Sequence, residues 1–178
     1  MKKNMLQNLL SISKTMILSS MIVIIISLLF VPFEVNGRSM EPTLNDGDKI
    51  LVFRLNHLYL PLIEKEVILS LPKKESIIAF KKENDVELVK RVIGLPNDKV
   101  DIRNQTVYVN DVIQPRGMTL TSPKMGFPIE IPENCIFVLG DNRILSNDSR
   151  QFGCVPLERI QGQIALRIWP INDLKLFR

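Results

Sequence analysis

A serine and a lysine in two separate motifs are the residues whose chemistry is most specific. Ser39 lies in the segment GRSMEPTL, and Lys90 lies in LVKRVIGLPNDKV. A serine hydroxyl attacks a carbonyl carbon only when a base within hydrogen-bond reach accepts its proton. Most hydrolases use histidine for this step, but the one histidine, His57, lies in neither motif. The two segments therefore predict a serine nucleophile with a lysine as its general base.

Lysine is a base only when neutral, so the residues around Lys90 would have to lower the pKa of its amine. In a strand, Lys90 shares a face with Leu88 and Val92, whereas Arg91 points to the opposite face. Burial against apolar side chains disfavours the ammonium and lowers its pKa. A solvated surface charge is the ordinary alternative, and strand context alone leaves the two interpretations balanced. For Ser39 taken alone, a turn or cap residue is the ordinary interpretation.

A third segment, residues 140–156, concentrates charged and hydroxyl side chains directly after an apolar stretch. Its candidate supporting residues are Asp141, Arg143, Ser146, Asp148 and Arg150. A polar surface loop is the plain alternative, but paired acids and arginines at this density suit a buried network that holds a site rigid. We expect the Ser146 hydroxyl to orient Lys90.

An apolar run near the N-terminus is the first element that positions these motifs. Residues 16–33 carry no charge and approach the minimum length for a helix that crosses a bilayer core of ~30 Å. We predict a transmembrane helix at residues 15–33, after a cytoplasmic tail at 1–14. A cleaved secretory signal is the alternative, but its apolar region would be shorter, and no small-x-small site follows the run.

The charges flanking this run predict its orientation. Lys2, Lys3 and Lys14 precede the run, which favours a cytoplasmic N-terminus. Residues 34–178 would then form an extracytoplasmic domain at the cell membrane.

Short apolar segments separated by turns predict that this domain is mainly β. The expected strands are Lys49–Arg54, Ser76–Phe80, Val86–Ile93, Val100–Ile102, Thr106–Val109, Cys135–Leu139 and Gln163–Trp169. Residues 56–66 could hold a helical turn. Residues 101–134 are irregular and rich in proline, and we predict that they form a small β region inserted into the main domain.

Composition excludes several classes of function. The net charge of +4 is modest, and basic residues are mixed with acidic ones, which disfavours nucleic-acid binding. The sequence has no phosphate-binding loop and no metal-ligand cluster, so we expect neither a cofactor nor a metal. Cys135 and Cys154 lie in apolar stretches where buried free thiols are common, although the extracytoplasmic side permits a disulfide.

The motifs GRSMEPTL, GDKILVF, LVKRVIGLPNDKV and GDNRILSNDSRQFG, in this order after an N-terminal anchor, resemble those of the bacterial type I signal peptidases of family S26. The resemblance spans nearly the whole chain, and its compact length is similar to the Gram-positive branch. It implies a fold of coiled antiparallel β-sheets with a smaller second β region. It also implies a membrane-anchored serine endopeptidase whose partners are exported preproteins and the lipid bilayer.

The resemblance assigns roles to individual residues. It implies that Ser39 is the nucleophile that becomes acylated, that Lys90 is the general base and that Ser146 orients the lysine. The implied ion-pair network behind them comprises Arg143, Asp148 and Arg150, with Asp141 as a further support.

The resemblance also implies removal of signal peptides by cleavage after small-x-small sequences, typically Ala-x-Ala. A substrate strand added to an edge of the enzyme would place alternate side chains in pockets, which leaves the middle position free. The residues implied to line these pockets are Val35, Met40, Leu44, Leu88 and Val89. Ordinary core positions are the alternative for all of them, and especially for Leu44.

Two positions depart from the common pattern of the family. Gly37 occupies the place where many Gram-negative members have an oxyanion-binding serine, so the second oxyanion donor is unassigned. Asn97 replaces the usual glycine of the turn after the lysine motif. Asparagine tolerates a left-handed backbone better than most residues, so we expect the turn to be kept.

Other functions need different sequence features. The related serine–lysine self-cleaving or maturation proteases generally lack a membrane anchor. A catalytically impaired homologue that acts as a binding protein should have lost the serine or the lysine, and both are present. Four ordered motifs make coincidence in an unrelated anchored β-domain remote.

Overall fold

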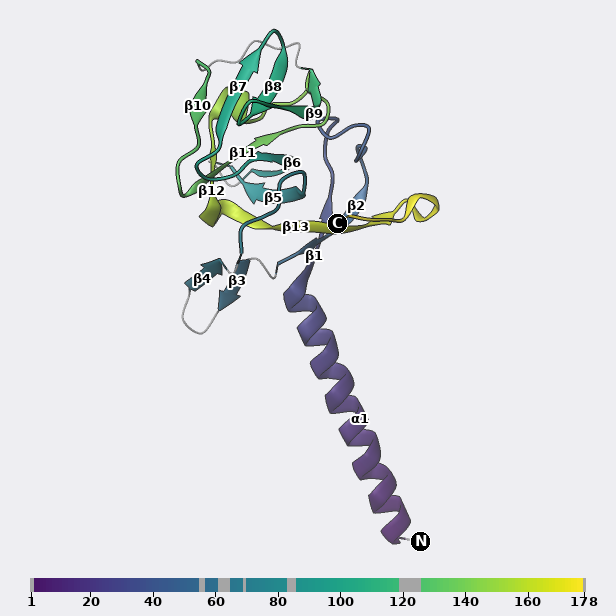
Figure 1. The fold of residues 1–178 in the computed structure, drawn as a ribbon. Coiled ribbons are helices and arrows are strands. Elements are labelled where there is room, and N and C mark those ends of the chain that lie inside the picture. Colours follow the sequence, from purple (N-terminus) through teal and green to yellow (C-terminus); the bar gives the residue numbers. More distant parts are fainter. Residues whose placement is uncertain are drawn as a thin grey trace.

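The computed structural model describes residues 2–54, 57–60, 65–68, 70–82, 86–118 and 126–177, as one long helix and a β-rich head (Figure 1). The strands of the head begin with β1 (Phe30–Glu34), β2 (Lys49–Phe53), β3 (His57–Leu60), β4 (Lys65–Ile68), β5 (Ile77–Lys81), β6 (Glu87–Gly94) and β7 (Lys99–Arg103). They continue with β8 (Thr106–Val109), β9 (Val112–Met118), β10 (Ile129–Glu130), β11 (Cys135–Leu139), β12 (Val155–Pro156), β13 (Ile160–Trp169) and β14 (Lys175–Leu176). The helices are α1 (Lys2–Leu29), α2 (Ser149–Phe152) and the short 3-10 turns η2 (Leu157–Arg159) and η3 (Ile171–Asp173).

Helix α1 extends away from the head as a single rod (Figure 1). Its segment Ser11–Leu29 has a mean hydropathy of 2.1 and is not buried inside the head. The expectation that this helix runs to Phe33 is wrong, because it ends at Leu29 and β1 follows at once. Pro32 explains the early end, since proline lacks an N–H and disfavours a helical residue before it. The residues of β1 pair with β2 instead.

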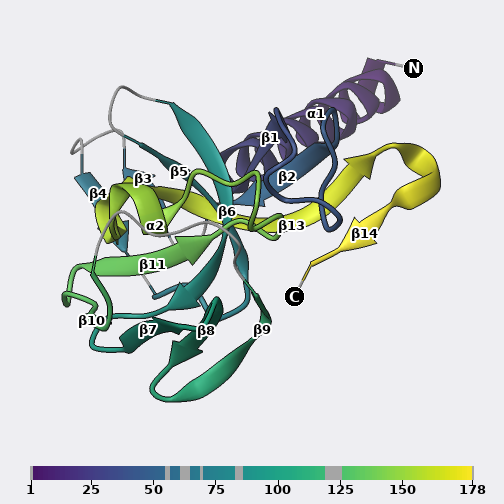
Figure 2. The ribbon, with the colours of Figure 1, turned by 90° about the horizontal axis from the view of Figure 1, so that it is seen from above.

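The main sheet is antiparallel and brings the motifs together. It has eight strands in the order β1-β2-β13-β5-β6-β11-β12, with β14 paired to β13. Figure 2 shows β13 crossing the head and leading to β14 on the side opposite β3 and β4. The mainly β class that the strand pattern predicts is confirmed. One apolar cluster includes Met40 and Val89, and another includes Ile78 and Val92, so β6 contributes to both.

A separate sheet lies at the end of the head farthest from α1 (Figure 1). Its four strands have the order β10-β7-β8-β9 and fall close to the inserted region expected at residues 101–134. Val100, Val107, Val109 and Ile131 form its core together with Phe137 of the main sheet. The turn before it is kept, because Asn97 adopts a φ of 66°. We call strands β7–β10 the inserted sheet.

Strands β3 and β4 form a hairpin that replaces the helical turn expected at residues 56–66. The register runs from His57 opposite Ile68 to Leu60 opposite Lys65. The expectation of a helical turn is therefore wrong for the described residues. Tyr59 and Val67 belong to the aromatic and β-branched types that favour strands over helices.

Candidate active site

The side chains of Ser39 and Lys90 meet although 51 positions separate them in the sequence. Ser39 lies in the turn between β1 and β2, and Lys90 lies in the middle of β6. The distance between Lys90 Nζ and Ser39 Oγ is 2.7 Å, and Nζ also donates a hydrogen bond of 2.9 Å to the carbonyl oxygen of Val89. The geometry is that of a hydroxyl and a base that can exchange a proton.

The main sheet keeps the Lys90 amine away from water. Lys90 is only 2% exposed, and it lies opposite Ile78 of the neighbouring strand β5. Leu88 and Val92, expected to lie on its face of the strand, pack in the same apolar cluster as Ile78. Burial lowers the pKa of the Lys90 amine from 10.5 to about 8, and the negative charge of Asp148 opposes this shift only in part. A useful fraction of the amine is therefore neutral near neutral pH.

A surface groove opens beside the two catalytic candidates. It is lined by Phe33, Glu34, Val35, Asn36, Ser39, Met40, Glu87, Leu88, Val89 and Lys90. Four of the expected pocket residues, Val35, Met40, Leu88 and Val89, are among these. Leu44 is fully buried in the cluster around Met40 and does not line the groove. The alternative interpretation, that Leu44 is an ordinary core residue, is therefore the one that the structure supports.

The turn that carries Ser39 is fixed by polar contacts on both sides. Gly37 has a φ of 96°, a conformation that favours glycine, and its N–H donates a 2.6 Å hydrogen bond to Asp46. The buried pair of Asp48 and Arg167 lies behind the turn, at 2.9 Å between Oδ2 and Nη1. Arg167 also donates to the carbonyl oxygen of Thr43. We did not predict a role for these two residues, since they lie 119 positions apart.

The segment after β11 is a buried polar network, as the density of its charges predicts. Asp148 and Arg150 are both completely buried and bonded at 2.8 Å. Arg150 also donates to the carbonyl oxygen of Arg143, whose own Nε donates to that of Gly140. The N–H of Gly140 donates to Asp148 in return. We call residues 140–152 the network segment.

The network segment contacts Ser39 through its backbone. The N–H of Asn142 donates a 3.0 Å hydrogen bond to the carbonyl oxygen of Ser39. A Cβ atom on Gly140 would lie 2.2 Å from Ser146 Oγ and 2.5 Å from the carbonyl oxygen of Ser39. Only glycine therefore fits between Ser146 and the turn that carries Ser39, a requirement that the sequence pattern did not reveal.

Ser146 lies beside this contact, but the structure does not pair it with Lys90. Its Oγ is buried and has no hydrogen-bond partner among the described residues. The expected hydrogen bond from Lys90 is absent, because the amine is directed to Ser39 Oγ and the carbonyl oxygen of Val89. Ser146 is thus close to the turn that carries Ser39, but it makes no hydrogen bond to Lys90.

Arg91 is a supporting residue that the sequence motifs did not single out. It occupies the opposite face of β6 from Lys90, where its guanidinium binds both carboxylate oxygens of Asp141 at 2.7 and 2.6 Å. This pair ties the network segment to the strand that carries the base. The signal available in the sequence was the alternation of the strand, which puts the residue next to Lys90 on the other face.

Cys135 and Cys154 are joined by a disulfide, with 5.6 Å between their Cα atoms. The expectation of buried free thiols is therefore wrong. The antiparallel pairing of β11 with β12 brings the two residues together, because Cys135 lies opposite Pro156, two residues beyond Cys154.

Comparison with known proteins identifies the family. The sequence profile described as "Signal peptidase, peptidase S26" matches residues 9–169. The chain is 34% identical to signal peptidase I of Bacillus caldolyticus, over 81% of this chain and 82% of that protein. It is 29% identical to signal peptidase IB of Staphylococcus aureus (strain Mu50 / ATCC 700699), over 98% and 95% of the two chains.

A signal peptidase I from Enterococcus faecalis V583 is a similar solved structure, at 31% identity and a TM-score of 0.41. The match covers 53% of this chain and 97% of that one. The family profile spans most of the sequence, and the relatives align over most of their length. The chain therefore belongs to the signal peptidase family, peptidase S26, and is a serine endopeptidase.

Proposed function

We propose that this endopeptidase removes signal peptides from exported preproteins, with Ser39 as the nucleophile and Lys90 as the general base. The observation that carries the proposal is the 2.7 Å contact between Ser39 Oγ and the amine of the buried Lys90. Neutral Lys90 takes the proton of the Ser39 hydroxyl while Oγ attacks the scissile carbonyl carbon. The resulting ammonium protonates the leaving amine. Lys90, neutral again, then activates the water that hydrolyses the acyl-enzyme.

The tetrahedral intermediate needs a hydrogen-bond donor for its oxyanion. The N–H of Ser39 donates no hydrogen bond within the described part of the chain, so it is open to this role. The N–H of Gly37 is bonded to Asp46 and does not serve. One preorganised donor of this kind contributes about 2.7–4 kcal/mol in other enzymes.

The groove favours an extended substrate with small side chains. Leu88 and Val89 form one wall, and Val35 and Met40 contribute the apolar floor next to Ser39. A peptide laid along β6 would place alternate side chains in the groove and leave the intervening one outside. This accounts for the small-x-small specificity that we propose, with Ala-x-Ala as its typical form.

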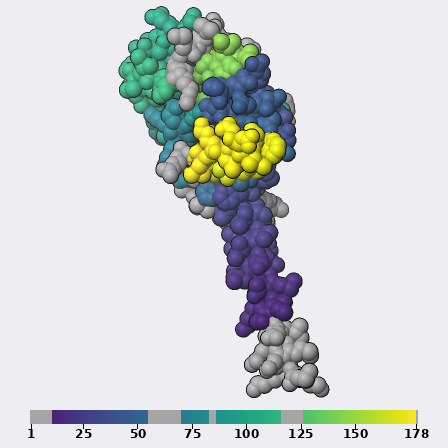
Figure 3. Space-filling view, turned by 90° about the vertical axis from the view of Figure 1, so that its right-hand side faces the viewer, coloured from purple at the N-terminus to yellow at the C-terminus, as the bar shows by residue number. Residues whose placement is uncertain are grey.

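A membrane location is supported by an apolar face that α1 shares with the C-terminal strands. The hollow between them is lined by Val23, Ile26, Ser27, Phe30, Leu51, Ala165, Leu166 and Leu176. Figure 3 shows the C-terminal segment directly above α1 on this side. Trp169 and Ile171 are half exposed or more beside it. We propose that α1 crosses the bilayer with its N-terminus in the cytoplasm and that this face lies at the outer surface.

The catalytic proposal is tested by incubating the purified chain in detergent with a preprotein peptide that contains one Ala-x-Ala site. Cleavage after the second alanine is expected, and Ser39→Ala and Lys90→Ala should each abolish it while the circular dichroism spectrum stays native. Retained cleavage in Lys90→Ala would contradict the mechanism.

The membrane proposal is tested with the single tryptophan, Trp169. In vesicles that contain brominated phospholipids, its fluorescence should be quenched relative to vesicles of unbrominated lipid. Equal fluorescence in the two would place this face away from the bilayer. Protease added outside intact cells should digest the head only if it is extracytoplasmic.

A further inference from the structure

The disulfide closes a loop that contains the whole network segment. Cys135 is the first residue of β11, and Cys154 follows α2, with a sequence separation of 19. Asp141, Arg143, Ser146, Asp148 and Arg150 all lie between the two cysteines. The covalent bond therefore joins the start of β11, the strand that leads into the supporting residues, to the chain that returns after α2.

Most polar contacts of the network segment are internal. Arg150 binds Asp148 and the carbonyl oxygen of Arg143, and Gly140 N–H binds Asp148. These bonds fix the shape of the segment, but they do not by themselves fix its position relative to Ser39. That position matters, because Asn142 N–H binds the carbonyl oxygen of Ser39.

The return of the segment to the sheet is held by several contacts. Ser149 Oγ accepts a hydrogen bond from the N–H of Val138, Phe152 and Val155 pack in the apolar cluster of Ile78, and the Arg91–Asp141 pair ties the segment to β6. Strand β12 pairs with β11 at only two positions, Cys135 opposite Pro156 and Ile136 opposite Val155. Helix α2 has only four residues. The disulfide lies at the same end of β11 as these pairs and adds a covalent restraint to them.

We propose that the Cys135–Cys154 disulfide is a positioning element for the serine–lysine pair, so that the activity depends on the oxidation state of these cysteines. This inference rests on the proposed function. In the oxidised protein the segment is held against the turn of Ser39. When the bond is broken, the segment can move away from the turn of Ser39, and the Asp148 carboxylate moves with it relative to Lys90.

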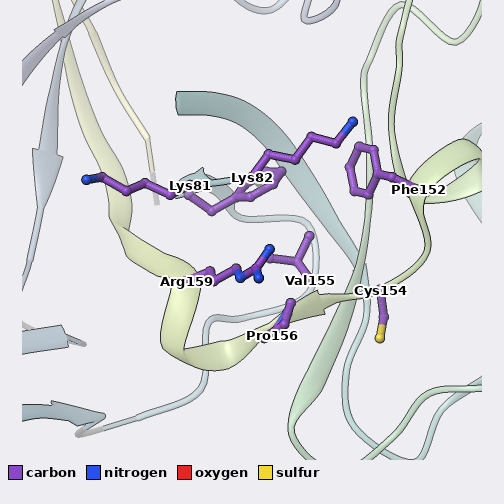
Figure 4. Close-up of a pocket in the computed structure, with 8 residues that line it drawn as sticks. Lys81, Lys82, Phe152, Cys154, Val155, Pro156 and Arg159 are labelled. Carbon is purple, nitrogen blue, oxygen red and sulfur yellow. The ribbon is translucent and has the colours of Figure 1, made fainter. Parts of the chain in front are cut away.

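The bond can be reached by a dithiol reductant. Cys135 is 6% exposed, whereas Cys154 is only partly buried, so Cys154 is the more exposed of the two residues. Cys154 lies at the edge of a pocket lined also by Lys81, Lys82 and Arg159, with its sulfur directed away from these side chains (Figure 4). One thiolate of the reductant attacks the Cys154 sulfur and releases the Cys135 thiolate. The second thiolate then attacks the mixed disulfide, closes the reductant's own disulfide and releases the Cys154 thiolate. The two cysteines take up the protons that the dithiol has lost.

The test compares the oxidised full chain, the same protein after a dithiol reductant, and Cys135→Ala/Cys154→Ala, all in detergent. Alkylation and mass measurement should find no free thiol before reduction and two after it. Reduction should lower kcat/KM for the preprotein peptide by about 10- to 100-fold, as a displacement of roughly 1 Å in an active site can do. Reoxidation should restore the rate. The double variant should match the reduced protein and be insensitive to the reductant.

Two further readouts separate positioning from mere stability. The pH midpoint of kcat/KM should change in the reduced form, because the Asp148 carboxylate raises the pKa of Lys90 and its distance from the amine changes when the segment moves. Hydrogen exchange of the backbone around Asn142 should become faster, while exchange in β5 stays unchanged. A protein that is stabilised by the bond only globally would keep its pH midpoint at temperatures where it is fully folded.

Each outcome bears on one proposal. Free thiols in the unreduced protein, or equal rates and pH midpoints in the two redox states, would overturn the positioning role. An oxidised protein that cleaves no preprotein peptide would overturn the proposed function instead. In that case unchanged exchange at Asn142 on reduction would still refute the positioning role, and faster exchange would support it.

Discussion

The network segment and the inserted sheet both contain arginine–aspartate pairs, but the two regions use them differently. Asp148 and Arg150 are completely buried, whereas the side chains of Arg103 and Asp111 are 47% and 70% exposed. A buried charge without a partner is costly, so the buried pair fixes one arrangement of the chain. An exposed pair is screened by water and contributes little. Charge therefore specifies the geometry beside Ser39, while apolar packing holds the inserted sheet.

The largest difference between the regions should appear when one arginine is removed from each. Arg150→Met leaves the carboxylate of Asp148 buried without its partner, and we expect it to lower the free energy of unfolding by about 3–5 kcal/mol. Arg103→Met should unfold at the same urea concentration as the wild type. Equal losses in urea titrations of the two variants would remove the distinction.

A methyl group added at one glycine of each region should change activity by different amounts. Gly140→Ala pushes against Ser146 and the turn of Ser39, and a shift near 1 Å there should lower kcat about 100-fold. Gly126, which precedes β10, has no atom within 4 Å of the position that an added Cβ would take, so Gly126→Ala is the matched control. Peptide cleavage assays measure both, and a fully active Gly140→Ala would show that the close contact is unimportant.

The pH dependence of the reaction should follow Lys90 of β6, which lies in the field of Asp148 of the network segment, and should be independent of the inserted sheet. Because the pKa of Lys90 is lowered to about 8, kcat/KM should rise about tenfold per pH unit below that value and level off above it. Arg103→Met should keep this midpoint. A rate that is flat from acid to alkaline pH would contradict a neutral lysine base.

The same pKa shift predicts an effect on stability with a definite sign. Between pH 8 and 10.5 the unfolded chain binds more protons at Lys90 than the folded one, so stability rises with pH across this window. Lys90→Met lacks this contribution. The free energy of unfolding of the wild type should therefore rise relative to that of the variant between pH 8 and 10.5, and a constant difference would argue against the shift.

The smallest effect is expected where the inserted sheet joins the rest of the head. Asp98 accepts hydrogen bonds from Lys74 and from Asn110 of the inserted sheet. Burial opposes its charge, but Lys74, the N–H of Leu95 and Asn110 together lower its pKa. Asp98→Asn should cost about 1–2 kcal/mol at neutral pH without changing kcat. The contribution of Asp98 is present above its ordinary pKa and is lost as the pH falls through its lowered value.

Urea titrations at neutral and acidic pH check this last prediction, with Lys74→Met as the control for the ion pair. A loss larger than that of Arg150→Met would mean that the junction, and not the network segment, depends most on buried charge.

Several elements could be predicted because their signals are local. The long apolar run near the N-terminus predicts a helix, and most of the run lies in α1. The alternation of side chains around Lys90 predicts a strand, which is β6. The boundary at Leu29 was missed because the pairing of β1 with β2 ends the helix, and apolar residues such as Phe30 and Val31 suit both structures. The hairpin of β3 and β4 was missed because its short segments have no distinctive helical or strand period.

The candidate site was predictable in its residue types and less so in its contacts. Ser39 and Lys90 stand out because a hydroxyl and an amine in apolar contexts suggest a specific chemistry. The pairs Arg91–Asp141 and Asp48–Arg167 join distant segments, so no local pattern indicates them. The partner of Ser146 was mistaken because a sequence contains the hydroxyl but does not show where the lysine amine points.

The sequence by itself determined which groups are available for the site: the hydroxyl of Ser39, the amine of Lys90, a charged segment after a strand and two cysteines. Side-chain chemistry and strand alternation are properties of the chain at close range, so they can be read from it. The tertiary structure decided that the Lys90 amine is dry, that Gly140 must be glycine and that Cys135 meets Cys154. Those outcomes depend on burial and on contacts between segments brought together only by sheet pairing.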